Sequence, residues 1–139
     1  MDYRLAKNED LDLLAHWNEQ LIIDEGQSRP INREKLAEDM AKWLADSYQA
    51  VLFSVGEKDV AYALFREGNN EIYLRQFFVR RDQRRLGLGR IAVSLLREEV
   101  WTPKKRICVA ALVDNPVAIN FWKAVGFTDY AVTLTIPPE

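Results

Sequence analysis

Apolar positions in the first third of the chain recur at helical spacing. A short strand over 3–6 precedes a helix predicted over 11–23. Gly26 and Pro30 end this pattern, and Asn32 is a suitable N-cap for a second helix. The apolar face of that helix comprises Leu36, Met40, Trp43 and Leu44.

Three strand-like runs follow. The segments 50–55 and 60–65 are apolar and are joined by the polar turn 56–59, which is typical of a β-hairpin. A further turn, Gly68-Asn69-Asn70, leads into 71–79, the longest strand candidate. The pattern therefore predicts three consecutive antiparallel strands.

The second half of the chain changes to a helical period. Apolar residues over 88–100 recur every 3.6 residues, and 106–113 is predicted to be a buried strand. Asn115 and the proline after it mark the start of another helix, which ends at Gly126. The run 127–136 is predicted to be a last strand. Strand, helix and strand within 71–113 predict a right-handed βαβ unit with parallel strands.

Size and composition narrow the picture to one α+β domain. The chain has 139 residues, 48% of them hydrophobic and 29% charged, so residues 1–139 are expected to share one core. A net charge of -2 gives no reason to expect nucleic acid as a partner. No apolar run has the length of a signal peptide or a membrane span, so we expect a cytoplasmic protein with no membrane partner.

Cysteine and histidine are scarce. Cys108 and His16 are the only residues of their types, so the sequence predicts neither a disulfide nor a metal site. Cys108 is expected in the core of its strand and His16 on the surface of the first helix.

The segment between the strand 71–79 and the next helix carries the clearest chemical signal. Residues 80–90 contain two glycines and five arginines at a predicted helix N-terminus, where free backbone N–H groups favour an anion. A diphosphate suits this loop, although a plain solvated turn is also compatible with it. A Rossmann dinucleotide site requires a third glycine and a P-loop requires Gly-Lys-Ser/Thr, and the loop contains neither. Nucleic-acid binding through the arginines is disfavoured, because the sequence offers no extended basic face.

Two segments together resemble the GNAT-type N-acetyltransferases. Val79 is followed by Arg84-Arg85-Leu86-Gly87-Leu88-Gly89, which is similar to the acetyl-CoA loop of that family. The segment 115–127, NPVAINFWKAVGF, is similar to a second family motif. The resemblance is close over 71–127. It implies the GNAT-like fold, a central mixed and mostly antiparallel sheet with a parallel βαβ unit and about four helices around it.

The resemblance implies acetyl-CoA as acyl donor and assigns residues to it. The backbone of Phe77, Phe78 and Val79 would bind the pantetheine arm. Asn115 matches a position that often contacts the cofactor, while its role as an N-cap explains it equally well. The diphosphate would be held by Arg84, Arg85, Leu86, Gly87, Leu88, Gly89 and Arg90.

The catalytic positions depart from the family pattern. Tyr73 stands where many relatives have a glutamate base, and strict alternation would place Tyr73, Arg75, Phe77 and Val79 on one face with Glu71. Glu71 or ordered water is therefore the expected base. Trp122 replaces a tyrosine that is often proposed as the acid, and its indole is expected to pack on or bond the pantetheine. Tyr130 is a weaker substitute acid.

The loop after the first helix is expected to line the acceptor pocket. Asp24 and Glu25 would favour a cationic amine, and Arg29 lies in the same loop. Arg75 would favour a carboxylate, so an acceptor that carries both groups fits these residues. The alternative interpretation is that these residues are ordinary surface charges with no role in binding.

Taken together, these patterns predict an N-acetyltransferase that acts on an amine of a small molecule or peptide by direct attack on the thioester. The alternative is a non-catalytic acyl-CoA-binding or regulatory module of the same fold, because both familiar catalytic positions are changed. The unpaired edge of the last predicted strand, 127–136, favours a homodimer, and a monomer with a covered terminal strand is the alternative.

Overall fold

The structure is a computed structural model that describes residues 1–26 and 30–139. Its centre is a five-stranded sheet in the order β1-β2-β3-β4-β5. The first four strands are antiparallel neighbours, and β5 is parallel to β4. The strands are β1 (Asp2–Leu5), β2 (Tyr48–Val55), β3 (Lys58–Glu67), β4 (Glu71–Val79) and β5 (Arg106–Val109).

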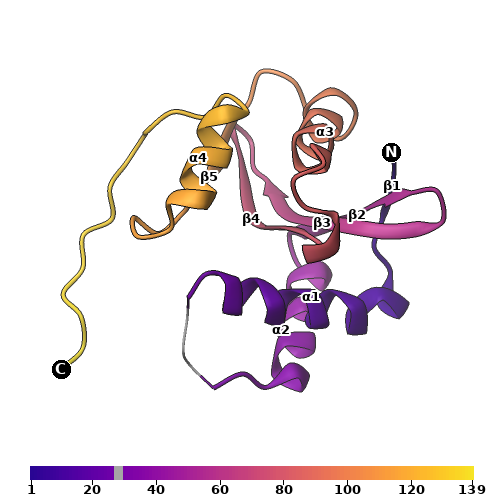
Figure 1. Cartoon of the computed structure of the whole chain (residues 1–139), viewed down its shortest axis with the longest axis horizontal. Helices are drawn as coiled ribbons and strands as arrows, with labels where there is room; N and C mark the ends of the chain where they lie inside the picture. The colour runs from indigo at the N-terminus through magenta and orange to yellow at the C-terminus, as the bar shows by residue number, and fades with distance from the viewer. Residues whose placement is uncertain (27–29) are drawn as a thin grey trace.

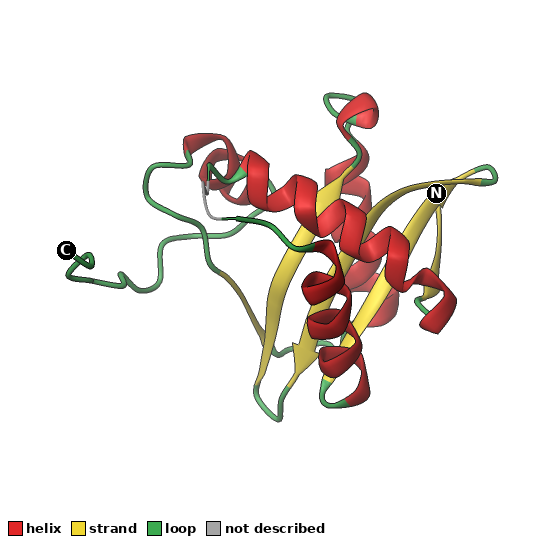
Figure 2. Cartoon of the chain, turned by 90° about the horizontal axis from the view of Figure 1, so that it is seen from below, coloured by secondary structure: helices red, strands yellow, loops and turns green. Residues whose placement is uncertain are grey.

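In the described residues, four α-helices cover the two faces of this sheet (Figures 1 and 2). One face packs against the first two helices, and the other against the last two. The helices are α1 (Leu11–Asp24), α2 (Arg33–Ala45), α3 (Leu88–Leu95) and α4 (Pro116–Ala124). A π-helical turn, Leu96–Val100, extends α3. The predicted α+β class, with its parallel βαβ unit and four helices, is confirmed.

The strands β2 and β3 are buried on both faces of the sheet, which explains their continuous apolar sequences. In β2, Val51 and Phe53 face α3, whereas Ala50 and Leu52 face α1 and α2. The helix boundaries follow the predicted capping: Asn32 Oδ1 accepts from the backbone N–H of Lys35 at 3.2 Å. The sheet is thus a rigid layer from which the site is built.

Three predictions about strands are wrong. β5 ends at Val109 rather than at residue 113, and it is half-buried. The run 127–136 forms no strand and is exposed at Tyr130 and beyond. Its alternating pattern suits a strand, but a strand forms only where a neighbouring strand supplies hydrogen-bond partners, and no strand of the described residues lies beside this segment.

The third correction concerns β4, where the register shifts between Leu64 and Phe65 of β3. Leu64 pairs with Gln76 and Phe65 with Leu74, so Arg75 is the extra residue of a β-bulge. The bulge breaks the alternation along the strand. Tyr73 contacts the cluster under α1 and α2, whereas Phe77 and Val79 pack on the opposite face.

Candidate active site

The site begins where β4 and β5 diverge. The two strands pair only from Glu71 to Leu74 of β4, so the β5-facing edge of Arg75 to Val79 has no strand beside it in the described part of the chain. A cavity of about 770 Å³ occupies this region. Its walls come from the ends of β4 and β5, the end of α1, the loop before α3, and α4.

Two glycines shape the loop side of the cavity. Gly87 caps α3 with a left-handed φ of 77°, and no side chain bonds the first N–H groups of the helix. Gly89 lies against α4: a Cβ at this position would stand 3.0 Å from the Phe121 ring. The backbone of the helix start is therefore open to the cavity, and this geometry suits a diphosphate.

The arginines of the loop fall into two groups. Arg84 Nη2 and Arg81 Nη2 both bond the carboxylate of Asp24, at 2.7 and 3.0 Å, and Arg84 Nε donates to the carbonyl of Val79 at 2.8 Å. These contacts join the end of α1 to the loop. Arg85 and Arg90 line the cavity and are exposed. They are the cations best placed for an incoming anion.

An aromatic cluster forms the floor next to Gly89. Trp122 is 9% exposed, and its ring lies 4.8 Å from that of Phe121, 5.4 Å from Phe77 and 5.3 Å from Phe127. Trp122 and Phe121 also line the cavity. Trp122 thus packs within this cluster, and its contact with the pantetheine stays a prediction. Its indole offers no proton that could leave at neutral pH.

Polar groups on the opposite wall come from the bulge. Arg75 stacks on Trp43 with its guanidinium carbon 4.5 Å from the ring centroid, and it bonds Tyr48 Oη at 3.4 Å. Gln76 Oε1 accepts from the hydroxyl of Tyr62 at 2.8 Å. Burial raises the pKa of Tyr62, and the charge of Glu25 acts in the same direction. Tyr62 is therefore a neutral donor that orients Gln76.

Most of the predicted site residues come together here. The predicted acceptor residues Asp24, Glu25 and Arg75 all line the cavity. The predicted cofactor residues that do so are Phe77, Phe78, Val79, Arg84, Arg85, Gly87, Leu88, Gly89, Arg90, Asn115 and Trp122. Leu86 is exposed and lies outside the lining, and Arg29 lies outside the described residues.

Several predicted roles look different in the structure. Asn115 Oδ1 accepts from the N–H of Ala118 at 3.2 Å, so its role as an N-cap is confirmed, and its cofactor contact stays a prediction. Asp24 is paired with two arginines rather than presented alone to an acceptor. Tyr130 Oη bonds Arg106 at 2.8 Å, at the start of β5 and outside the cavity lining.

Glu71 and Tyr73 stand apart from the cavity lining, toward the start of β4. Burial raises the pKa of the Cys108 thiol to about 11, and the carboxylate of Glu71 acts in the same direction. Cys108 is therefore a poor nucleophile, although it is half-buried and not part of the core as predicted. The role of Glu71 as a base stays a prediction.

Sequence reasoning missed other residues of the lining. Gln76 and Phe121 belong to the predicted elements, but only the bulge and the packing of α4 turn them to the cavity. Ala110 and Ala111 were assigned to a strand that ends before them. The family motif over 115–127 contains Phe121 and was the one sequence signal that pointed to it.

The fold and this site define a CoA-dependent acyltransferase, and the sequence matches the acetyltransferase (GNAT) family over residues 13–127. The chain belongs to that family and is an enzyme that uses acetyl-CoA. No curated protein matches the sequence significantly.

Solved structures share the fold at low sequence identity. A 6'-N-acetyltransferase for aminoglycoside antibiotics from Acinetobacter haemolyticus has a TM-score of 0.77 at 14% identity, covering 100% of this chain and 99% of its own. A predicted acetyltransferase from Clostridium acetobutylicum, solved with acetyl-CoA, has a TM-score of 0.73 at 21% identity, with coverages of 98% and 95%. None of the helices in the described residues is long and apolar enough to span a membrane.

Proposed function

We propose that this enzyme transfers the acetyl group of acetyl-CoA to an amine of a small molecule or peptide, by direct attack of the amine on the thioester. One observation carries the proposal: a single cavity connects the open N-terminus of α3 with the polar groups at the end of α1 and at the bulge of β4. A donor and an acceptor can therefore meet in the same space.

The residues of the loop fit the donor. The free N–H groups at the start of α3, together with Arg85 and Arg90, would hold the diphosphate. The β5-facing edge of β4 beyond Leu74 has backbone groups without a strand partner, which suits the amides of a pantetheine arm. Bound there, acetyl-CoA supplies the activated acetyl group.

The acceptor amine must lose a proton before attack, because an alkylamine has a pKa of about 10.4. Among the described residues, the carboxylates that line the cavity are Asp24, which pairs with two arginines, and Glu25, which also has interactions within the protein. We assign to Glu25 the role of holding the acceptor ammonium and of accepting its proton, directly or through water. Glu71, the earlier expectation, does not line the cavity.

Arg75 supports a preference for acceptors that also carry a carboxylate. Arg75 lines the cavity, and its guanidinium is fixed by stacking on Trp43 and by a bond to Tyr48. A planar guanidinium binds a carboxylate through two parallel hydrogen bonds. Amino acids and peptides with a free amine are therefore better candidates than polyamines, which lack this group.

The test is the release of free thiol from acetyl-CoA in the presence of amino acids, peptides, polyamines and aminoglycosides. We expect turnover with acceptors of the first two classes. Glu25→Gln should lower kcat/KM by at least about tenfold, while Glu71→Gln serves as the matched control and should stay within about twofold. If Glu71→Gln instead lowers kcat/KM more than Glu25→Gln does, Glu71 is the base. Tight acetyl-CoA binding without turnover on any amine would favour the non-catalytic module.

A further inference from the structure

The side chain of Gln76 connects a buried hydroxyl to the cavity. Gln76 follows the bulge in β4 and lines the cavity, and its Oε1 accepts from the hydroxyl of Tyr62 at 2.8 Å. Tyr62 lies in β3 and is fully buried, with its ring centroid 6.1 Å from those of Trp17 and Phe78. The hydroxyl therefore has a fixed position, and the amide that it bonds forms part of the cavity wall.

Hydrogen-bonding rules decide which end of this amide is left for a ligand. Burial raises the pKa of Tyr62, so its hydroxyl keeps its proton and needs an acceptor. A carboxamide has an acceptor oxygen at one end and a donor NH₂ group at the other. If the amide were reversed, the hydroxyl proton would lose its acceptor, because this hydroxyl has no second partner in the described part of the chain. Oε1 therefore faces Tyr62, and Nε2 is the end that can bind a ligand.

The groups around this amide differ in polarity between the two sides of the cavity. Gln76 Nε2 makes no hydrogen bond to another described residue, and the side chain of Arg75, the preceding residue, carries only donors. Glu25, directly after α1, lines the same cavity, and its charge contributes to the raised pKa of Tyr62. The carboxylate of Glu25 and the amide of Gln76 can therefore bind two groups of one small molecule.

We propose that Gln76 is a specificity-determining residue, whose Nε2 donates a hydrogen bond to an oxygen atom of the acceptor next to the reacting amine. The inference rests on the proposed function, in which Glu25 holds that amine as an ammonium. An α-amino acid or a peptide N-terminus has a carbonyl group on the carbon that bears the amine, so both contacts can form. The ε-amine of a lysine side chain has no oxygen at this position, and a second ammonium of a polyamine would meet only donors there.

Two ligands isolate this contact. Phenylalaninamide and phenethylamine share the amine and the ring, but only the first has a carbonyl group next to the amine, and neither has a carboxylate for Arg75. Calorimetry on the full-length chain saturated with CoA measures their binding without turnover. We define the preference ratio as the dissociation constant of phenethylamine divided by that of phenylalaninamide. The difference in basicity between the two amines is the same for every variant, so a change in this ratio reports on the protein.

Gln76→Glu replaces the donor with an acceptor and keeps the bond to Tyr62, because a carboxylate also accepts from a hydroxyl. We expect the preference ratio of this variant to fall by at least about tenfold from that of the wild type. Gln49→Glu makes the same change at an exposed position of β2 outside the cavity lining, and its ratio should stay within about twofold of the wild type. An unchanged ratio in Gln76→Glu, or a wild type that binds neither amine, would overturn the inference.

Tyr62→Phe tests whether the hydroxyl acts through the amide. Without the hydroxyl, the amide of Gln76 can turn either end to the cavity, so we expect the preference ratio to fall several-fold. In a Gln76→Leu background the same substitution should change the ratio no further, because the group that the hydroxyl orients is gone. An equal effect in both backgrounds would contradict the positioning role of Tyr62.

Thiol release from acetyl-CoA with the same two amines separates this inference from the proposed function. If the preference ratio falls in Gln76→Glu but the wild type acetylates neither amine, the donor role of Gln76 is supported and the proposed function is wrong. If the wild type acetylates both amines and Gln76→Glu leaves the ratio unchanged, the proposed function is supported and the inference about Gln76 is wrong.

Discussion

Gly87 and Gly89 have different roles although they stand two residues apart. Gly89 is favoured by packing, because a Cβ there would approach the Phe121 ring to 3.0 Å and the ring would have to move. At Gly87 a Cβ would meet no atom within 4 Å, and glycine is favoured there because the backbone has a left-handed φ of 77°. The open space at Gly87 is the region that we assign to the diphosphate.

Gly87→Glu should therefore weaken acetyl-CoA binding far more than it destabilises the fold. The new carboxylate would occupy that space and repel the phosphates at the helix N-terminus. We expect at least about tenfold weaker binding by calorimetry, which is about 1.4 kcal/mol. Gly87→Asn tolerates the left-handed backbone, adds no charge and is the control. Equal affinity of Gly87→Glu and the wild type would remove the diphosphate from this loop.

At the scale of elements, one carboxylate joins α1 to the loop before α3. Asp24, the last residue of α1, accepts from Arg81 at 3.0 Å and from Arg84 at 2.7 Å. Arg84 is also fixed by the carbonyl of Val79 and lies over the Phe78 ring. The shape of the loop thus depends on a helix that is distant in sequence.

Asp24→Asn should loosen this loop without directly affecting the acceptor. We expect faster amide hydrogen exchange over 80–87 and a several-fold higher KM for acetyl-CoA, while the acceptor KM stays within about twofold. Asp82→Asn is the control, because Asp82 pairs with Arg80 and not with α1 in the described part of the chain. A rise in the acceptor KM with no change for acetyl-CoA would show that Asp24 binds the acceptor, as the sequence had suggested.

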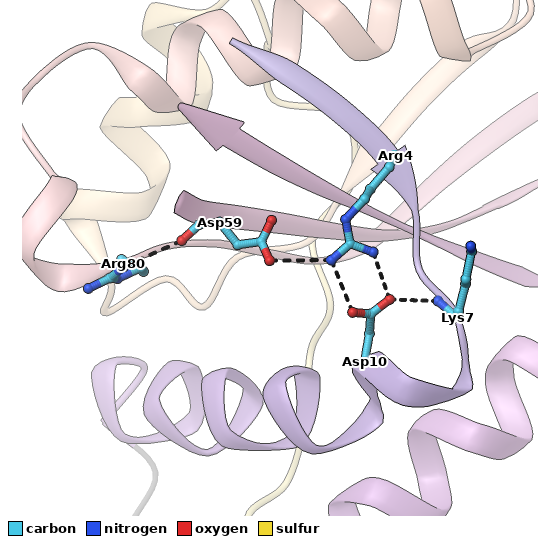
Figure 3. Close-up of polar contacts among 5 residues, drawn as sticks. All are labelled: Arg4, Lys7, Asp10, Asp59 and Arg80. Atoms are coloured by element: carbon cyan, nitrogen blue, oxygen red, sulfur yellow. Dashed lines mark hydrogen bonds and ion pairs between the residues drawn. The ribbon is translucent and has the colours of Figure 1, made fainter. Parts of the chain in front are cut away.

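At the scale of the whole molecule, a buried carboxylate connects the N-terminal strand to two other parts of the fold (Figure 3). Asp10 accepts two hydrogen bonds from Arg4, at 2.9 and 3.0 Å, and one from the backbone N–H of Lys7 at 2.8 Å. Arg4 also bonds Asp59 at the start of β3. β1, the start of α1 and the hairpin of β2 and β3 are held together at this point.

This contact should make stability depend on pH. The hydrogen bonds from Arg4 lower the pKa of Asp10, and that from Lys7 acts in the same direction, against the effect of burial. The folded pKa lies below the unfolded value of about 3.9, so the stabilisation is present above that pH and is lost as pH falls through the folded pKa.

Asp10→Asn should lower the free energy of unfolding by about 1–3 kcal/mol at pH 7. Denaturant unfolding at pH 7 and at acid pH measures this, and the difference from the wild type should shrink below about pH 4. Asp39→Asn, which removes an exposed pair with Lys35, is the control and should cost no more than about 0.5 kcal/mol. A difference that does not change with pH would mean that the charge of Asp10 is not the cause.

The sequence by itself determined the features that depend on neighbours along the chain. Helical and strand periodicity located α1 to α4 and β2 to β4, and the caps Asn32 and Asn115 are where local hydrogen-bonding rules place them. The glycine loop was recognisable because its backbone requirement and its place between strand and helix are both local.

Tertiary structure alone decided the features that depend on distant partners. The bulge at Arg75 arises from the register with β3 and turns Gln76 and Phe77 to the faces opposite those predicted by alternation. The pairing of Asp24 with two arginines was not visible in the sequence, because these partners lie 57 and 60 residues away. The run 127–136 has a strand-like pattern, but among the described residues no strand lies beside it, and a pattern of side chains cannot supply a hydrogen-bonding edge.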